Sequence, residues 1–119
     1  YANKLLRAFG EDLKGYPMGH TFMLSGLDFV LGPAQNVVLA GEITEKDTQA
    51  MLKTLRERYL PNLTVRLWTP QLDKSATIGL NYLQIEGKAT AYVCVNQTCM
   101  PPTKDKKIML EYLESDKQK

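Results

Sequence analysis

The chain has 119 residues, the size of one domain or of a small domain with an appendage. With 44% hydrophobic and 24% charged residues, its composition excludes a disordered segment. The formal net charge of +2 gives no reason to expect nucleic acid or an anionic membrane as a partner. No apolar run approaches the length of a membrane span, and no signal peptide is visible.

Two helices are predicted at the N-terminal end. Residues 2–13 carry apolar side chains at i, i+3, i+4, i+7 and i+11, which form one stripe along a helix. Residues 18–31 are apolar around nearly the whole circumference of a second helix, which we therefore expect to be buried on more than one side. Gly15 and Pro17 form a short turn between the two helices, and Gly32-Pro33 ends the second, so residues 1–34 are predicted to form an αα-hairpin. The alternative is that the apolar surface of residues 18–31 is left exposed in this chain and causes copies of the chain to self-associate.

Residues 35–119 have the pattern of a small α/β module. The short apolar run at 36–40 is typical of a strand buried on both faces in a parallel sheet, and we expect this strand to be central. Thr44 and Asp47 have the spacing of a capping box, so a helix is predicted from 44 to 59. A second strand near 64–68 completes a βαβ unit, whose crossover should be right-handed.

The rest of the module is predicted to hold one more strand and one more helix. The strand lies near 90–94, and the helix runs from 104 to 114 with Thr103 as its N-cap. Residues 82–85 form either a half-turn or a short edge strand. The predicted fold class is α/β: a small, mostly parallel sheet of three strands, or of four if 82–85 pairs, with flanking helices and a preceding αα-hairpin.

Residue types that carry chemistry are few. Cys94, Cys99 and His20 are one ligand short of a closed zinc site, and His20 belongs to a different element, so we predict neither a metal nor a cofactor. The same separation argues against a Cys–His nucleophile pair. The loop 41–44 has one glycine and acidic neighbours, which argues against a phosphate site. Lysines at 104–107 alternate with acids, as on a solvated helix face.

Cys94 and Cys99 are the candidate site. Cys94 ends a predicted strand, and functional sites in α/β sheets usually lie at the carboxyl ends of strands. Their C-x4-C spacing differs from the C-x-x-C of thioredoxin-like oxidoreductases. Three alternatives stay open: packing cysteines, a structural or reversible disulfide, and a catalytic thiol pair in which Cys99 attacks and Cys94 resolves. We expect a cytoplasmic location, where thiols are kept reduced and the first alternative is favoured.

The segment 87–102 resembles the C-terminal region of one family. Its core is Ala91-Tyr92-Val93-Cys94, followed by Asn96 and Cys99. This pattern is similar to that of the YyaL and spermatogenesis-associated protein 20 family of thioredoxin-domain-containing proteins. Residues 33–41 and 57–62 resemble further elements of the same family in the same order.

The resemblance implies a larger parent protein with a thioredoxin-like domain, a helical toroid similar to six-hairpin glycosidases and sugar epimerases, and then this region. Residues 1–34 are then the end of the toroid, and residues 35–119 are a C-terminal module whose partners are the upstream domains. The absence of an initiator methionine before Tyr1 also leads us to expect a piece of a longer protein. The family's activity is not established, and it assigns no role to Cys94 or Cys99 that can be transferred.

Since no catalytic constellation is complete within the chain, we expect a non-catalytic module that serves packing or partner contact. Whether the parent is an enzyme stays open. The alternative function is a thiol–disulfide redox element that uses Cys94 and Cys99. A third, weaker alternative is sugar binding or isomerisation by the parent toroid, to which this chain contributes no ligand.

Overall fold

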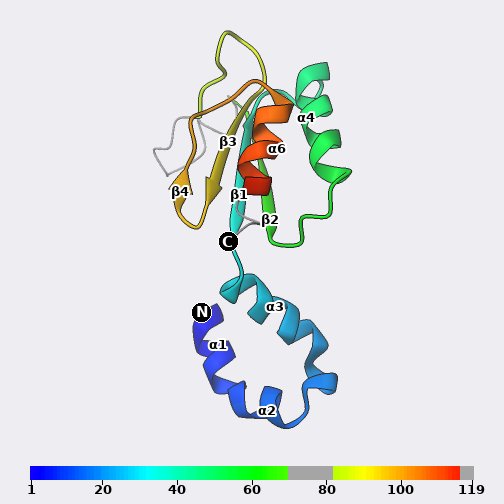
Figure 1. Ribbon diagram of the computed structural model, residues 1–119, viewed down its shortest axis with the longest axis vertical. Helices are drawn as coiled ribbons and strands as arrows, with labels where there is room; N and C mark the ends of the chain where they lie inside the picture. The colour runs from blue at the N-terminus through cyan, green and yellow to red at the C-terminus, as the bar shows by residue number, and fades with distance from the viewer. Residues whose placement is uncertain (70–81, 116–119) are drawn as a thin grey trace. The chain divides into compact units, whose positions relative to one another are not determined.

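The computed structural model describes residues 1–69 and 82–115. The chain divides into two compact units, Tyr1–Pro33 and Ala34–Lys119. The first is all helical and is called the helical unit below. The second combines strands and helices and is called the α/β unit (Figure 1).

The helical unit holds shorter helices than its sequence predicts. The predicted first helix is divided at Phe9, where φ is −102° and ψ is 10°, and the second begins with a 3-10 turn. The main contacts within the unit join elements that follow one another in the chain, so a packed αα-hairpin is not established. The elements are α1 (Ala2–Ala8), α2 (Gly10–Gly15), η1 (Pro17–His20) and α3 (Thr21–Leu31).

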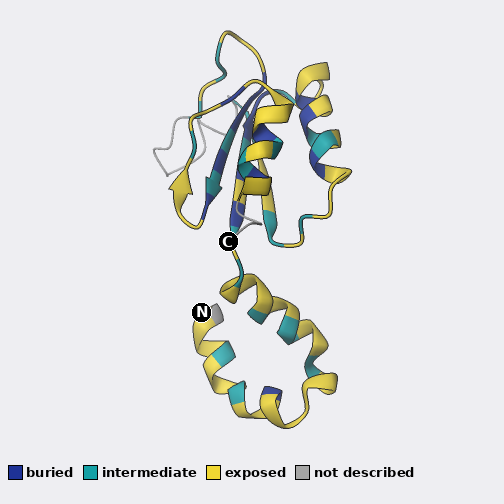
Figure 2. Cartoon of the chain, in the orientation of Figure 1, coloured by how far each residue is buried: buried dark blue, intermediate teal, exposed yellow. Residues whose placement is uncertain are grey.

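Helix α3 is not buried on several sides, contrary to the prediction from its apolar sequence. None of its residues is buried, and the Phe22 side chain is 94% exposed. Figure 2 shows the helices of this unit as mostly exposed. The unit itself supplies too few packing partners, and its apolar side chains are left facing solvent.

The α/β unit is built on a four-stranded sheet with the order β2-β1-β3-β4. The predicted central position of the first strand and its parallel pairing with the second are confirmed. The sheet is mixed, however, because β3 runs antiparallel to both β1 and β4. The strands are β1 (Gln35–Ala40), β2 (Leu63–Trp68), β3 (Thr90–Val95) and β4 (Thr98–Cys99), and the helices are α4 (Lys46–Arg56) and α6 (Lys106–Glu114).

The direction of β3 follows from where the chain leaves β2. Ala40 at the end of β1 pairs with both Trp68, the end of β2, and Thr90, the start of β3. Because β3 starts at the same end of β1 at which β2 finishes, it must run back along β1 in the opposite direction. For the third strand to be parallel to β1, the chain would first have to return to the other end of the strands through a second crossover connection.

The fourth strand does not lie at residues 82–85. In that stretch Ile85 forms only an isolated bridge with Lys88. The strand is instead β4, which β3 reaches through a two-residue turn at Asn96 and Gln97, with φ of 48° and 69°. Two positive φ values are those of a type I′ turn, whose twist matches that of the strands it joins.

The core lies between one face of the sheet and the two helices, as Figures 1 and 2 show. Alternate residues of β1 and β3, such as Val37 and Val93, point into it. On the opposite face, Asn36 is exposed and Val38 half-buried, so β1 is not buried on both faces as predicted. The core residues are Val37, Leu39, Met51, Leu55, Ala89, Ala91, Val93, Val95, Met109 and Leu113.

Both helices of this unit start two residues later than predicted. Helix α4 begins at Lys46, and neither Thr44 nor the N-cap Glu45 caps it through a side chain. The cap of α6 is Asp105, which accepts a hydrogen bond from the Lys107 N–H, and not Thr103. Thr103 instead pairs with Ala91 of β3, and before α4 the chain forms a turn in which the Glu45 N–H donates to the Glu42 carbonyl.

Candidate functional site

Cys94 and Cys99 form a disulfide across the β3–β4 hairpin, with their Cα atoms 3.9 Å apart. The Val95–Thr98 pair closes the turn, and the Met100 N–H donates to the Val93 carbonyl at 2.8 Å. The two cysteines therefore occupy the non-hydrogen-bonded position between these pairs, where opposed side chains lie closest. The hairpin register itself brings the two sulfurs together. We call this bond the hairpin disulfide.

The hairpin disulfide is accessible on the side of β4. Cys99 is exposed and Cys94 is half-buried, and the turn residues 96–98 are all exposed. The Asn96 N–H donates to the carbonyl of Ala34, which anchors the turn to the chain just before β1. The exposed cysteine of the pair, Cys99, thus lies two residues after a turn whose backbone is anchored to the chain before β1.

The other candidate ligand of the sequence, His20, lies in the helical unit, where its Nδ1 is 2.9 Å from the Tyr16 carbonyl. In the part of the chain that the structure describes, no three His, Cys, Asp or Glu side chains gather as a metal site would require. The chemistry available at the hairpin is that of the disulfide. A thiolate can attack one of its sulfurs, and exposed disulfides are reduced more readily than buried ones.

We expect the double variant Cys94→Ser/Cys99→Ser to lower the free energy of unfolding by about 2 kcal/mol, the entropy of closing so short a loop. Urea denaturation of the oxidised chain and of the variant measures the difference. The wild type in excess dithiothreitol is the matched control and should resemble the variant. Equal stability of all three samples would contradict a disulfide in the folded chain.

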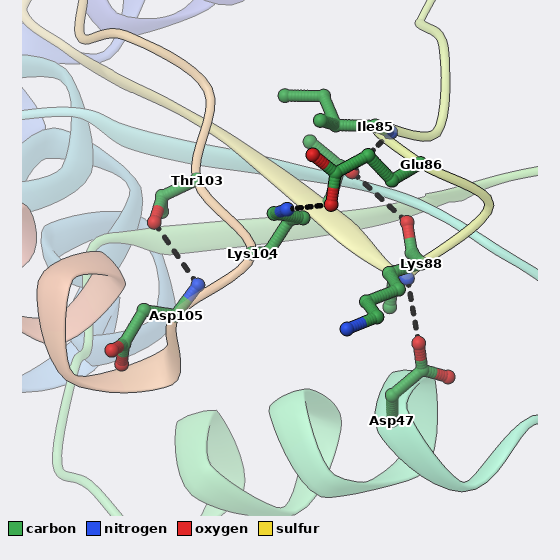
Figure 3. Close-up of polar contacts among 9 residues, drawn as sticks. Asp47, Ile85, Glu86, Lys88, Thr103, Lys104 and Asp105 are labelled. Carbon is green, nitrogen blue, oxygen red and sulfur yellow. Dashed lines mark hydrogen bonds and ion pairs between the residues drawn. The ribbon is translucent and has the colours of Figure 1, made fainter.

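A second cluster of polar contacts joins the start of α4, the turn at 85–88 and the segment before α6 (Figure 3). The Asp47 carboxylate accepts from the Ala89 N–H at 2.7 Å and from the Thr48 N–H at 2.8 Å. Lys104 forms an ion pair with Glu86. These contacts border a shallow groove of about 610 Å³. Its lining is Asp47, Ala50, Met51, Ile85, Pro102, Thr103, Lys104, Asp105, Lys106 and Ile108.

Two carboxylates of this cluster, Asp47 and Glu86, are stabilised in their ionised forms. The Ala89 N–H is the main cause that lowers the pKa of Asp47, and the hydrogen bond from Lys104 lowers the pKa of Glu86. Groups that are ionised and hydrogen-bonded in this way are poor general acids or bases near neutral pH. We conclude that the cluster is a structural clamp. No local sequence pattern indicates this clamp, because Asp47 and Ala89 are 42 residues apart.

We expect Asp47→Ala to lower the free energy of unfolding by about 1 kcal/mol at pH 7, since its hydrogen bonds are charge-assisted but solvent-screened. The folded-state pKa lies below the ordinary 3.8, so this stabilisation is complete above 3.8 and is lost as the pH falls through the folded-state value. Urea denaturation at pH 7 and at pH 3 measures both effects. A variant with an unchanged dependence of stability on acid pH would contradict the assignment.

A third feature is a pocket of about 310 Å³ at the carboxyl ends of β1 and β2. Trp68 is buried, and its ring lies edge to face with that of Tyr82, with the ring centroids 5.5 Å apart. The rings of Tyr82 and Tyr92 also lie edge to face, with their centroids 4.9 Å apart. Among the residues that the structure describes, those lining the pocket are apolar, aromatic or amide side chains and glycine. Its lining is Ala40, Gly41, Trp68, Tyr82, Leu83, Gln84 and Gly87.

The sequence also has named relatives. Human spermatogenesis-associated protein 20 is 30% identical to the chain over 105 residues, which is 85% of the chain. The chain is homologous to spermatogenesis-associated protein 20. The rat and mouse proteins of the same name are each 29% identical over 105 residues. The family likeness predicted from residues 87–102 is thus confirmed.

The chain spans 13% of the length of these relatives. No family model and no solved structure matches it. Within residues 1–69 and 82–115, none of the helices combines the length and the hydropathy needed to cross a membrane.

Proposed function

We propose that the α/β unit is a non-catalytic C-terminal module of a longer, cytoplasmic protein and that the helical unit is the end of an upstream helical domain. The observation that carries this proposal is the uncovered apolar surface of α3 in a chain that matches 13% of its relatives' length. The role of both units is then packing against the rest of the parent protein, or contact with a partner.

The energetics of α3 support a missing partner surface. The helix has 11 residues, and isolated helices of this length are marginal in water without tertiary packing. Phe22 and Leu31 of α3 are 94% and 76% exposed, and Met18 of the preceding turn η1 is 78% exposed. Covering one such side chain contributes about 1.5–3 kcal/mol, so a domain that covers several would hold the helix firmly. The upstream part of the parent chain is the occupant that we propose.

We expect Phe22→Ser to act differently in the short chain and in the full-length parent. In the parent it should lower the free energy of unfolding of the upstream domain by about 1.5–3 kcal/mol, because Phe22 is buried there. In the short chain it should reduce self-association at high concentration and leave the α/β unit equally stable. Denaturation curves and gel filtration measure the two effects.

The matched control is Asp28→Ser, an exposed substitution in the same helix that we expect to change stability by less than about 0.5 kcal/mol in the parent. If Phe22→Ser is as harmless as Asp28→Ser in the full-length protein, α3 is not covered by the upstream chain. The packing proposal is then wrong.

A second function is a thiol–disulfide redox element, and the hairpin disulfide is the observation that favours it. In the cytoplasm such an element must exchange with the thiol pool. The test is a titration of the native chain across glutathione potentials, with the free thiols alkylated and counted by mass. Reversible conversion between roughly −320 and −220 mV supports the redox function. A bond that stays oxidised throughout is a structural staple, and thiols that react only after unfolding are packing residues.

The non-catalytic proposal makes an opposite prediction for the full-length protein. Cys94→Ser and Cys99→Ser should then leave any activity of the parent unchanged under reducing conditions. A large loss from either conservative substitution would favour the redox function.

A further inference from the structure

We infer that the outer edge of β4 is a docking edge for an extended, cysteine-bearing segment of a protein dithiol, which exchanges with the hairpin disulfide at Cys99. This inference rests on the redox function proposed above and names the class of its partner. It is carried by the register of the hairpin, the position of β4 in the sheet and the unequal exposure of the two cysteine residues.

The register leaves the backbone of Cys99 unpaired by β3. Val95 pairs with Thr98, and Met100 donates to Val93, so the residues on either side of Cys99 bond inward. Successive residues of a strand direct their N–H and C=O groups to opposite sides, and those of Cys99 therefore point away from β3. Within the described residues β4 ends the sheet, so this donor and acceptor face an open edge.

Such an edge accepts a short extended segment by β-strand addition, with main-chain hydrogen bonds fixing the register. A residue placed opposite Cys99 would have its Cβ about 4.5–5.5 Å from that of Cys99, a distance at which sulfurs can meet. Pro101 and Pro102 have no N–H and end the pairing edge just after Met100. The contact is therefore short and centred on Cys99.

The direction of the disulfide favours attack from this edge. The bond runs across the hairpin from Cys94 in β3 to Cys99 in β4, so a third strand beside β4 lies on the far side of Cys99 from Cys94. Displacement at sulfur proceeds with the nucleophile opposite the leaving sulfur. Cys99 is also the exposed member of the pair, while Cys94 is half-buried beside Asn36. Both facts select Cys99 as the sulfur attacked.

The exchange balances as two displacements. The first partner thiolate attacks the Cys99 Sγ, the intramolecular S–S bond breaks, and Cys94 leaves as a thiolate that takes up a proton. A mixed disulfide joins the partner to Cys99. The second partner thiolate then attacks the partner's own sulfur in that bond and releases Cys99 as a thiol. The chain gains two electrons and two protons, and the partner dithiol becomes a disulfide.

The test compares two reductants of the oxidised chain, with each rate constant expressed per thiolate, because the two reductants differ in the fraction of thiolate that they contain. The probes are reduced thioredoxin, as a protein dithiol with an extended-segment binding surface, and dithiothreitol. We expect the second-order rate constant with thioredoxin to be at least about tenfold larger, as docking that contributes 1.4 kcal/mol requires. Equal rate constants would overturn the docking edge while leaving the redox function intact. Resistance to both reductants would overturn the redox function itself.

A trapped complex tests the sulfur and the backbone separately. Thioredoxin that lacks its resolving cysteine should form a mixed disulfide with Cys99, and peptide mapping that finds it on Cys94 would contradict the inference. In the trapped complex, hydrogen exchange at the Cys99 amide should slow by at least about tenfold. The matched control is the Met100 amide, which already bonds to β3 and should not change. An unchanged Cys99 amide would mean that the thiol reacts without strand pairing.

Discussion

Replacing Met109 with alanine will lower the free energy of unfolding of the α/β unit by about 2–5 kcal/mol. Met109 is 0% exposed and lies in the core between α6 and the sheet. The truncation removes a buried thioether chain and leaves a cavity that its neighbours fill only in part. Since small domains have about 5–15 kcal/mol of stability in total, the change removes a large part of it.

The matched control is Ile108→Ala, one residue earlier in the same helix, where the side chain is 38% exposed. We expect the control to cost about 1 kcal/mol or less, because its side chain is already partly in water. Urea denaturation followed by circular dichroism compares the two variants. Similar losses from both would show that α6 does not pack through its Met109 face, and the arrangement of the core would then be wrong.

This core also positions the hairpin. Val93 and Val95 of β3 point into it, and Cys94 lies between them on the other face of the sheet. Packing of α6 against β3 therefore fixes the strand from which the disulfide projects. The site at the sheet edge depends on residues that never contact either sulfur.

Strands β1, β2 and β3 and helices α4 and α6 could be located from the sequence to within a few residues, because their signals are local. Runs such as Val37-Val38-Leu39 and Leu63-Thr64-Val65 are enough to place β1 and β2 within a residue or so. The direction of β3 was not predictable in the same way. It depends on the end of β1 at which the chain re-enters the sheet after Trp68. No local pattern in the sequence encodes that position.

Cys94 and Cys99 stood out in the sequence, and a disulfide between them was one of three alternatives that the sequence left open. The C-x4-C spacing identified Cys94 and Cys99, yet the turn between them contains Asn96 and Gln97 in place of the Asn-Gly typical of type I′ turns. Without that glycine the segment has the pattern of a loop, and the tight hairpin stays hidden. The role of Asp47 was missed for a related reason, since its partner Ala89 is distant in sequence.

Gly41, which follows β1, lies against α4, and a substitution there tests how closely this strand and this helix pack. A Cβ at Gly41 would lie 2.5 Å from Thr48 Oγ1 and 3.5 Å from the Ala89 Cα. Gly41→Ala is therefore expected to lower the free energy of unfolding by about 1–3 kcal/mol through overpacking. Gly41 is therefore needed for the close packing of α4 on the sheet. A packing role agrees with the acidic residues near the loop 41–44, which argue against a phosphate site there.

The partner in this contact is unusual, because Thr48 Oγ1 is buried and has no hydrogen-bond partner among the described residues. Thr48→Ala removes the hydroxyl that a Cβ at Gly41 would clash with. By itself it should leave the free energy of unfolding nearly unchanged, because the loss of a buried methyl group is offset by the loss of an unsatisfied buried hydroxyl. In the double variant Gly41→Ala/Thr48→Ala, most of the loss caused by Gly41→Ala should be recovered, with a coupling energy of about 1 kcal/mol or more. Denaturation of the four proteins gives this coupling, and strict additivity would mean that Gly41 is required for another reason.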